Sequence, residues 1–174
     1  MKQVKDYVRT IPDFPEKGIM LRDITTVVAD AEGLKLAVDE MTDLLDGVEF
    51  DAIVGLESRG FIFGMPMAYN LHKPFVLVRK KGKLPRETVS VKYDLEYGTA
   101  EIEVHKEDIK PGERVVLVDD LLATGGTMKA AAELVEKLGA NVVKMVFLLE
   151  LSGLNGRKKL KGYDVSAVVS YEGK

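Results

Sequence analysis

The segment from residue 115 to residue 127 constrains the fold of this 174-residue chain more than any other feature. It begins with four apolar residues, which predict a buried strand, and continues with two acids, Asp119 and Asp120. A turn of small and hydroxyl-bearing residues follows, and then a helix predicted for residues 127–138. A strand, a tight turn and a helix in this order leave unpaired backbone N–H groups at the start of the helix. Because the helix dipole also favours negative charge there, the segment predicts an anion-binding site.

The chemistry of the turn favours a phosphate bound beside a diol. Two glycines let the backbone approach a ligand without a Cβ in the way, and two threonines supply hydroxyl donors. The carboxylates of Asp119 and Asp120 can accept hydrogen bonds from sugar hydroxyls, so the segment suits a ribose 5-phosphate. Neither the nucleotide P-loop pattern nor the dinucleotide fingerprint occurs. The residues expected to hold the phosphate are Ala123, Thr124, Gly125, Gly126 and Thr127.

Composition narrows the classes of function. The chain has no cysteine and two histidines, which excludes disulfides and thiol catalysis and argues against a zinc site. Magnesium held by substrate phosphates, carboxylates and water remains open. The net charge of −3 gives no overall field for nucleic acid or an anionic membrane, so neither is an expected partner. No apolar run is long enough to cross a bilayer, and the N-terminus has no apolar signal core, so a cytoplasmic location is expected.

Apolar strands alternate with helical patterns along the chain, which predicts one α/β domain. The strands are nearly all apolar, as in a mostly parallel sheet covered by helices on both faces. Two alternating segments, 89–93 and 100–104, predict a hairpin that projects from the domain. The N-terminus is predicted as a helix over 2–10 and a packed irregular loop over 11–24. The remaining predicted strands are 51–56, 74–79, 114–118, 142–149 and 165–169, and the remaining helices 34–45, 61–71, 127–138 and 155–160.

Three polar segments follow predicted strands directly: residues 57–59, 79–81 and 119–127. Ligands of such sheets bind at the carboxyl ends of the strands, so these segments should converge on one site. Basic residues gather in two places. One cluster lies at Arg79, Lys80, Lys81 and Lys83, and the second, called here the 157–161 cluster, comprises Arg157, Lys158, Lys159 and Lys161.

The segment Val-Asp-Asp-Leu-Leu-Ala-Thr-Gly-Gly-Thr at residues 118–127 closely resembles the motif with which type I phosphoribosyltransferases bind phosphoribosyl pyrophosphate (PRPP). The resemblance extends over nearly the whole chain. It implies the type I phosphoribosyltransferase fold, with a mostly parallel central sheet, a projecting β-hairpin lid and an N-terminal hood. The implied units within the single domain 1–174 are a hood at about 1–32, a core at about 33–174 and a flexible lid at about 80–104.

The same resemblance implies how the pyrophosphate is bound. The turn after the strand 51–56 carries Glu57, Ser58 and Arg59, and in the family the matching turn contains a non-proline cis peptide, here the Glu57–Ser58 bond. Arg79, with Lys80 and Lys83, would neutralise the pyrophosphate charge. In adenine-specific members the matching arginine reaches into the neighbouring subunit's site, which implies a homodimer. Mg²⁺ would be held through the substrate, with Asp119 the residue that could contact it.

Two further segments are similar to adenine-specific members of the family. The sequence Leu-Glu-Tyr-Gly at 95–98 implies a lid tip that includes Tyr97 and in which Glu96 is the general acid/base, with Arg59 as the second catalytic residue. The loop 14–24 resembles the hood that binds the base, although Lys17 and Leu21 replace a proline and a phenylalanine of the usual pattern. Adenine would then contact Met20, Leu21, Arg22 and Leu151.

The sequence therefore predicts transfer of a phosphoribosyl group from PRPP to adenine, giving AMP and pyrophosphate. Two alternatives remain open. The same fold could serve another base, such as xanthine, hypoxanthine or orotate. A regulator without activity could also keep the PRPP site as a sensor, although a sensor does not need a group such as Glu96 for the proton of the base.

Overall fold

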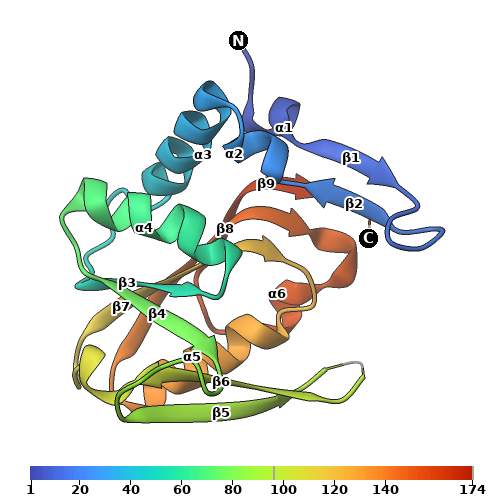
Figure 1. Cartoon of the computed structure of the whole chain (residues 1–174). Coiled ribbons are helices and arrows are strands. Elements are labelled where there is room, and N and C mark those ends of the chain that lie inside the picture. Colours follow the sequence, from blue (N-terminus) through green and yellow to red (C-terminus); the bar gives the residue numbers. More distant parts are fainter. Residues whose placement is uncertain (96, 174) are drawn as a thin grey trace.

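The computed structural model describes residues 1–95 and 97–173. Its centre is a seven-stranded sheet in the order β5-β6-β4-β3-β7-β8-β9 (Figure 1). Strands β3 (Ala52–Leu56), β4 (Phe75–Lys80), β7 (Arg114–Leu122), β8 (Asn141–Leu151) and β9 (Val165–Tyr171) pair in parallel. The prediction of a mostly parallel sheet is confirmed, and the chain is an α/β protein.

Helices cover both faces of the sheet and enclose two apolar cores. One face packs against α5 (Gly126–Lys137), whose buried side includes Ala131, Leu134 and Val135. The other packs against α3 (Ala31–Asp43) and α4 (Arg59–Leu71), which bury Met41, Phe63 and further apolar residues. Central strands read as continuous apolar runs because both of their faces are buried, as in β3, where every residue is buried.

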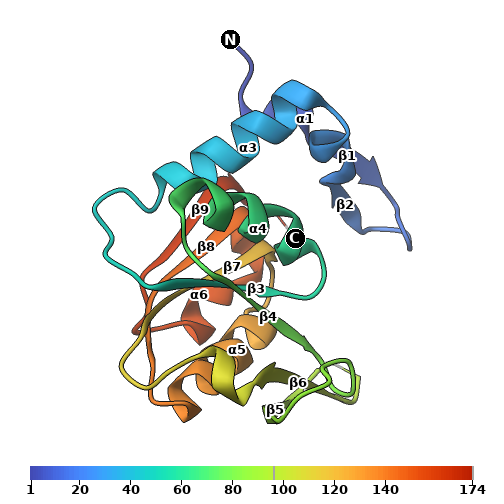
Figure 2. The same ribbon diagram turned by 60° about the vertical axis from the view of Figure 1, so that its left-hand side comes forward.

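The N-terminal segment differs from its prediction. The predicted helix over 2–10 is only α1 (Val4–Tyr7), and the predicted loop contains a two-stranded antiparallel sheet. Strand β1 (Arg9–Pro12) pairs with β2 (Met20–Asp23), and the short helix α2 (Thr25–Val28) follows. A loop was predicted here because the segment contains prolines. Pro12 is nevertheless the last residue of β1, at the edge of a two-stranded sheet, where its missing N–H is tolerated. Figure 2 shows this hairpin standing apart from the central sheet.

The predicted hairpin is present as β5 (Thr88–Asp94) and β6 (Thr99–His105). Its base does not project from the domain, because β6 continues the central sheet by pairing antiparallel with the end of β4. Val91, Ile102 and Val104 are buried in the core on the α5 side. Only the tip beyond these residues extends from the body of the molecule, on the same side as the β1–β2 hairpin (Figure 1). A short 3-10 helix, η1 (Lys106–Asp108), follows β6.

Strand β7 is four residues longer than predicted. It continues through Asp119 and Asp120 to Leu122 because pairing with β8 persists, with Leu121 opposite Leu149 and Leu122 opposite Glu150. The two acids therefore lie within the strand and are held by its ladder. After β8 come η2 (Ser152–Leu154) and the short helix α6 (Gly156–Lys159). In the described part of the chain, no helix has the length and apolar character needed to cross a bilayer.

Candidate active site

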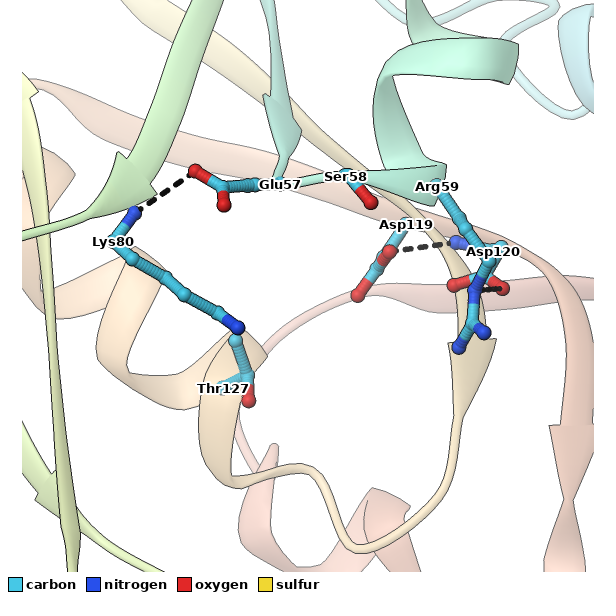
Figure 3. A pocket seen from close by; sticks show the side chains of 7 residues that line it. All are labelled: Glu57, Ser58, Arg59, Lys80, Asp119, Asp120 and Thr127. Carbon is cyan, nitrogen blue, oxygen red and sulfur yellow. Dashed lines mark hydrogen bonds and ion pairs between the residues drawn. The ribbon is translucent and has the colours of Figure 1, made fainter. Parts of the chain in front are cut away.

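The polar segments that follow β3, β4 and β7 lie together at the carboxyl edge of the sheet. They surround a cavity of about 310 Å³, called here the central cavity (Figure 3). This is the convergence that the strand pattern predicted. The residues that line it are Glu57, Ser58, Arg59, Lys80, Asp119, Asp120 and Thr127.

The turn between β3 and α4 forms one wall of the central cavity. The Glu57–Ser58 peptide bond is cis, as the family resemblance implied. Gly60 follows in the first turn of α4, where an added Cβ would stand 2.9 Å from the carbonyl oxygen of Val118 and 3.1 Å from Oδ1 of Asp119. Only glycine therefore lets α4 begin this close to β7, and this contact sets the distance between the Glu57–Ser58 turn and the aspartates.

Glu57 is bound by three groups of the basic segment at the end of β4 and just after it. Its Oε1 accepts hydrogen bonds from Nε of Arg79 at 3.0 Å and from the backbone N–H of Lys80 at 3.1 Å, and its Oε2 pairs with Nζ of Lys83. Burial alone would raise the pKa of Glu57, but these hydrogen bonds outweigh it and lower the pKa. Glu57 is thus a carboxylate that orients basic residues, and the lysine side chain of Lys80 extends across the cavity towards Thr127 (Figure 3).

The sequence assigned Arg79 and Lys83 to the pyrophosphate. In the structure each is paired with Glu57, and neither is among the residues that line the central cavity. Lys80 does line it. The pyrophosphate roles of Arg79 and Lys83 stay predictions.

The aspartate pair forms the opposite wall and has two different environments. Asp120 is buried, and its Oδ2 lies 2.7 Å from Nε of the more exposed Arg59. Oδ1 of Asp119 accepts the backbone N–H of Asp120 at 2.8 Å. Burial and the neighbouring charge of Asp120 raise the pKa of Asp119 well above its usual value. Asp119 is therefore the carboxylate whose charge a hydroxyl ligand or a cation would stabilise most.

The turn between β7 and α5 encloses a smaller cavity of about 90 Å³, called here the phosphate cradle. Gly125 has a φ of +89°, a conformation open to glycine, and it precedes the first residue of the 12-residue helix α5. The hydroxyls of Thr127 and Tyr93 share a hydrogen bond with an O···O distance of 3.2 Å. The five residues predicted to bind phosphate all line this cavity: Ala123, Thr124, Gly125, Gly126 and Thr127.

A third cavity of about 560 Å³, called here the apolar cavity, lies between the N-terminal hairpin and the sheet. All four residues predicted to contact adenine line it: Met20, Leu21, Arg22 and Leu151. The guanidinium of Arg22 stacks on the ring of Tyr171 at 4.2 Å, and its Nη1 donates to Oγ1 of Thr10. Its side chain thus ties the hairpin to β9.

The three cavities adjoin one another through shared residues. Asp119 and Thr127 line both the central cavity and the phosphate cradle, while Arg59 and Asp120 line both the central and the apolar cavity. One continuous site therefore runs from an anion cradle, past two aspartates and a basic wall, to an apolar slot. Tyr97, at the hairpin tip, is 89% exposed and is not among the residues that line the three cavities. Glu96, the predicted general acid/base, lies outside the described residues.

Sequence reasoning missed several residues around the site. Tyr93 was read only as part of an alternating strand, although its hydroxyl contacts the phosphate turn. Lys159 was read as one of several basic residues, although its side chain lies beside Gly125 and Gly126. No local signal distinguishes either residue, because both contacts join segments more than 30 residues apart. Further apolar residues of the slot are Phe14, Ile19, Leu121, Leu149 and Leu154.

Comparison with known proteins agrees with this geometry. The family model of the phosphoribosyl transferase domain matches residues 28–170, and the chain belongs to the phosphoribosyltransferase family. Its relatives place it, within that family, among the adenine phosphoribosyltransferases. It is 74% identical to the enzyme of that name from Agathobacter rectalis, over the full length of both chains.

Solved structures agree in fold over nearly the whole chain. The crystal structure of adenine phosphoribosyltransferase from Thermoanaerobacter pseudethanolicus superposes with a TM-score of 0.93 at 52% identity, covering 97% of this chain and 98% of that one. The Saccharomyces cerevisiae enzyme was solved as a complex with an imino-altritol bisphosphate and adenine. It superposes with a TM-score of 0.88 at 40% identity, covering 95% of this chain and 96% of that one. The fold predicted from the sequence is thereby confirmed.

Proposed function

We infer that the chain transfers the phosphoribosyl group of PRPP to adenine and releases pyrophosphate, forming AMP in purine salvage. Relatives of up to 74% identity carry this activity in their names. The observation that supports it within this chain is the sequence of three adjoining cavities. Their chemistry matches a phosphate, a ribose with its pyrophosphate, and a flat apolar base in that order.

The phosphate cradle receives the 5′-phosphate on backbone N–H groups and threonine hydroxyls of residues 123–127. Asp119 and Asp120 accept hydrogen bonds from the two ribose hydroxyls. The central cavity receives pyrophosphate against Ser58, Arg59 and Lys80. As the bond from C1′ to the pyrophosphate oxygen breaks, positive charge develops on the sugar, and the nearby carboxylates stabilise it. The cations of the opposite wall stabilise the departing pyrophosphate.

Magnesium fits this donor set when it is bound together with PRPP. Among the residues that the structure describes, no three metal-binding side chains gather into a cage. Mg²⁺ commonly binds through one or two carboxylates and completes its shell with substrate phosphates and water. Asp119 is positioned to be such a carboxylate, since its second oxygen is free of the backbone bond to Asp120. When bound, the ion would neutralise part of the pyrophosphate charge.

Adenine occupies the apolar cavity, between the backbone of the hood and Leu151. Its N9 attacks C1′ and loses a proton, and Glu96 on the lid receives that proton. The tip of the lid at residues 80–104 closes over the site while the base of the hairpin stays packed in the core. The closed tip excludes water, which would otherwise hydrolyse PRPP.

The chain acts as a homodimer in this proposal, with Arg79 contributing to the neighbouring site. The supporting observation is an apolar stripe on α4: Ile62, Met65 and Tyr69 are 40%, 54% and 84% exposed and share one helical face. Sedimentation of the wild type and of Met65→Glu tests it. A dimer for the wild type and a monomer for the variant are expected, and a wild-type monomer with full activity contradicts it.

A panel of bases assayed with PRPP and Mg²⁺ tests the proposed function. Pyrophosphate release is expected with adenine and not with hypoxanthine, xanthine or orotate. Release with a 6-oxopurine or orotate instead of adenine would assign the fold to another base. PRPP binding without release for any base would favour the sensor.

A further inference from the structure

The 157–161 cluster has no role in the reaction proposed above, and the structure divides its members. Arg157, Lys158 and Lys159 belong to α6, and Lys161 follows the helix. Figure 1 shows α6 beside the start of α5, where the phosphate cradle lies. The cluster is therefore near a site for an anion, and its four cations differ in what they contact.

The backbone of α6 touches the phosphate turn directly. An added Cβ on Gly125 would stand 2.8 Å from the carbonyl oxygen of Gly156, and one on Gly156 would stand 2.5 Å from the carbonyl oxygen of Ala123. Real Cβ atoms do not approach so closely, so glycine at both positions brings the two backbones into contact. Helix α6 therefore packs directly against the turn that encloses the phosphate cradle.

Arg157 fixes the position of this helix. Its Nε and Nη2 donate to the buried carboxylate of Glu150 on β8 at 2.7 and 2.9 Å, and its Nη1 donates to the carbonyl oxygen of Val165 on β9 at 2.8 Å. A bidentate pair with a buried carboxylate has one preferred geometry. Arg157 is therefore occupied in holding α6 against the sheet and is not available to a ligand.

Lys159 is the member whose side chain reaches the turn of the phosphate cradle. Its Cβ lies 3.3 Å from the position of a Cβ on Gly125, and its Nζ lies 3.9 Å from that of a Cβ on Gly126. Within residues 1–95 and 97–173, no carboxylate lies within ion-pair distance of Nζ of Lys159. The ammonium group of Lys159 thus lies beside the two glycines and has no ion-pair partner among the described residues. Its charge is available for an anion bound at the turn.

We propose that Lys159 binds the 5′-phosphate of PRPP and of AMP as a charged donor from α6. The proposal rests on the proposed function, because it takes the cradle as the 5′-phosphate site. The donors of the turn are neutral amides and hydroxyls, and the helix start supplies only about half an elementary charge. A phosphate dianion is thus incompletely neutralised by them, and an ammonium at this distance supplies a full positive charge and a charge-assisted hydrogen bond.

The test compares Lys159→Gln with Lys158→Gln, the adjacent exposed lysine on the same helix. Steady-state kinetics should show the KM for PRPP rising roughly tenfold in Lys159→Gln, the scale of one hydrogen bond to a charged group. The kcat and the KM for adenine should stay within about twofold, and Lys159→Arg should retain most of the affinity. Lys158→Gln should match the wild type. Thermal unfolding of each variant checks that the fold is unchanged.

Calorimetric binding of ribose 5-phosphate, without base or pyrophosphate, separates this proposal from the proposed function. The affinity should fall in Lys159→Gln, and its decrease with added salt should become shallower because one cation fewer is involved. Equal affinity in Lys159→Gln and the wild type, or equal losses in both lysine variants, would overturn the role of Lys159. A wild type that binds ribose 5-phosphate but releases no pyrophosphate from PRPP with any base would overturn the proposed function alone.

Discussion

Replacing Gly125 by alanine should damage the phosphate cradle, for two separable reasons. The φ of +89° at Gly125 is unfavourable for an L-residue by about 1–2 kcal/mol. The added Cβ would also meet the carbonyl oxygen of Gly156 at 2.8 Å, which is backbone and cannot rotate away. Overpacking of this kind costs about 1–3 kcal/mol. We therefore expect Gly125→Ala to lose about 2–5 kcal/mol of stability, the sum of these two ranges.

Gly112→Ala is the matched control. Gly112 has a φ of +83°, but nothing lies within 4 Å of an added Cβ. It should therefore lose only the conformational part, about 1–2 kcal/mol. Urea unfolding at equal protein concentration measures both variants. The KM for PRPP should rise in Gly125→Ala and stay unchanged in Gly112→Ala, because only the first displaces α6 from the cradle.

Equal losses of stability in the two variants would refute the close-contact argument. It would mean that the turn and α6 can separate without cost. A Gly125→Ala variant with the stability loss but normal KM for PRPP would show that the cradle does not hold the phosphate.

Three further predictions concern the reaction and the pH dependence. Glu96→Gln should lower turnover with adenine by more than about threefold. A smaller change, under about 1 kcal/mol of activation barrier, would contradict the role of Glu96 in accepting the proton. Tyr93→Phe loses one hydrogen bond to Thr127, so its affinity for AMP should fall roughly two- to tenfold while its affinity for adenine stays unchanged. Calorimetry measures both affinities. Because folding raises the pKa of Asp119, its contribution to stability is greatest below the usual aspartate pKa and is lost as pH rises through the folded pKa. Asp119→Asn should therefore unfold at a higher urea concentration than the wild type at pH 7 and should be inactive. Equal urea midpoints for the two proteins would contradict this.

The local patterns of the sequence predicted the elements near the site well. Strand β3 and helix α3 lie within a few residues of their predicted bounds, because apolar runs and helical spacing are local properties. The phosphate turn was found for the same reason: all its donors lie within residues 123–127, so neither packing nor a distant partner is needed to bring them together.

Elements that depend on pairing were predicted less well. Strand β7 was predicted to end at Val118 because polar residues follow. In the structure, backbone pairing with β8 continues the strand through both aspartates. The N-terminal hood was read as an irregular loop, because its two short strands are stable only when paired with each other. In both cases a backbone partner distant in the sequence outweighed the local residue preferences.

The sequence by itself determined an α/β domain with a parallel sheet, and a glycine- and threonine-rich turn that follows two adjacent acids, since these follow from residue types a few positions apart. The tertiary structure alone decided what each charged side chain does. It pairs Glu57 with Arg79 and Lys83, sets Arg59 against Asp120, and places Lys159 beside the cradle. The physical reason is that charge and hydrogen bonding act over a few ångströms of space, and residues far apart along the chain come that close only when the sheet has formed.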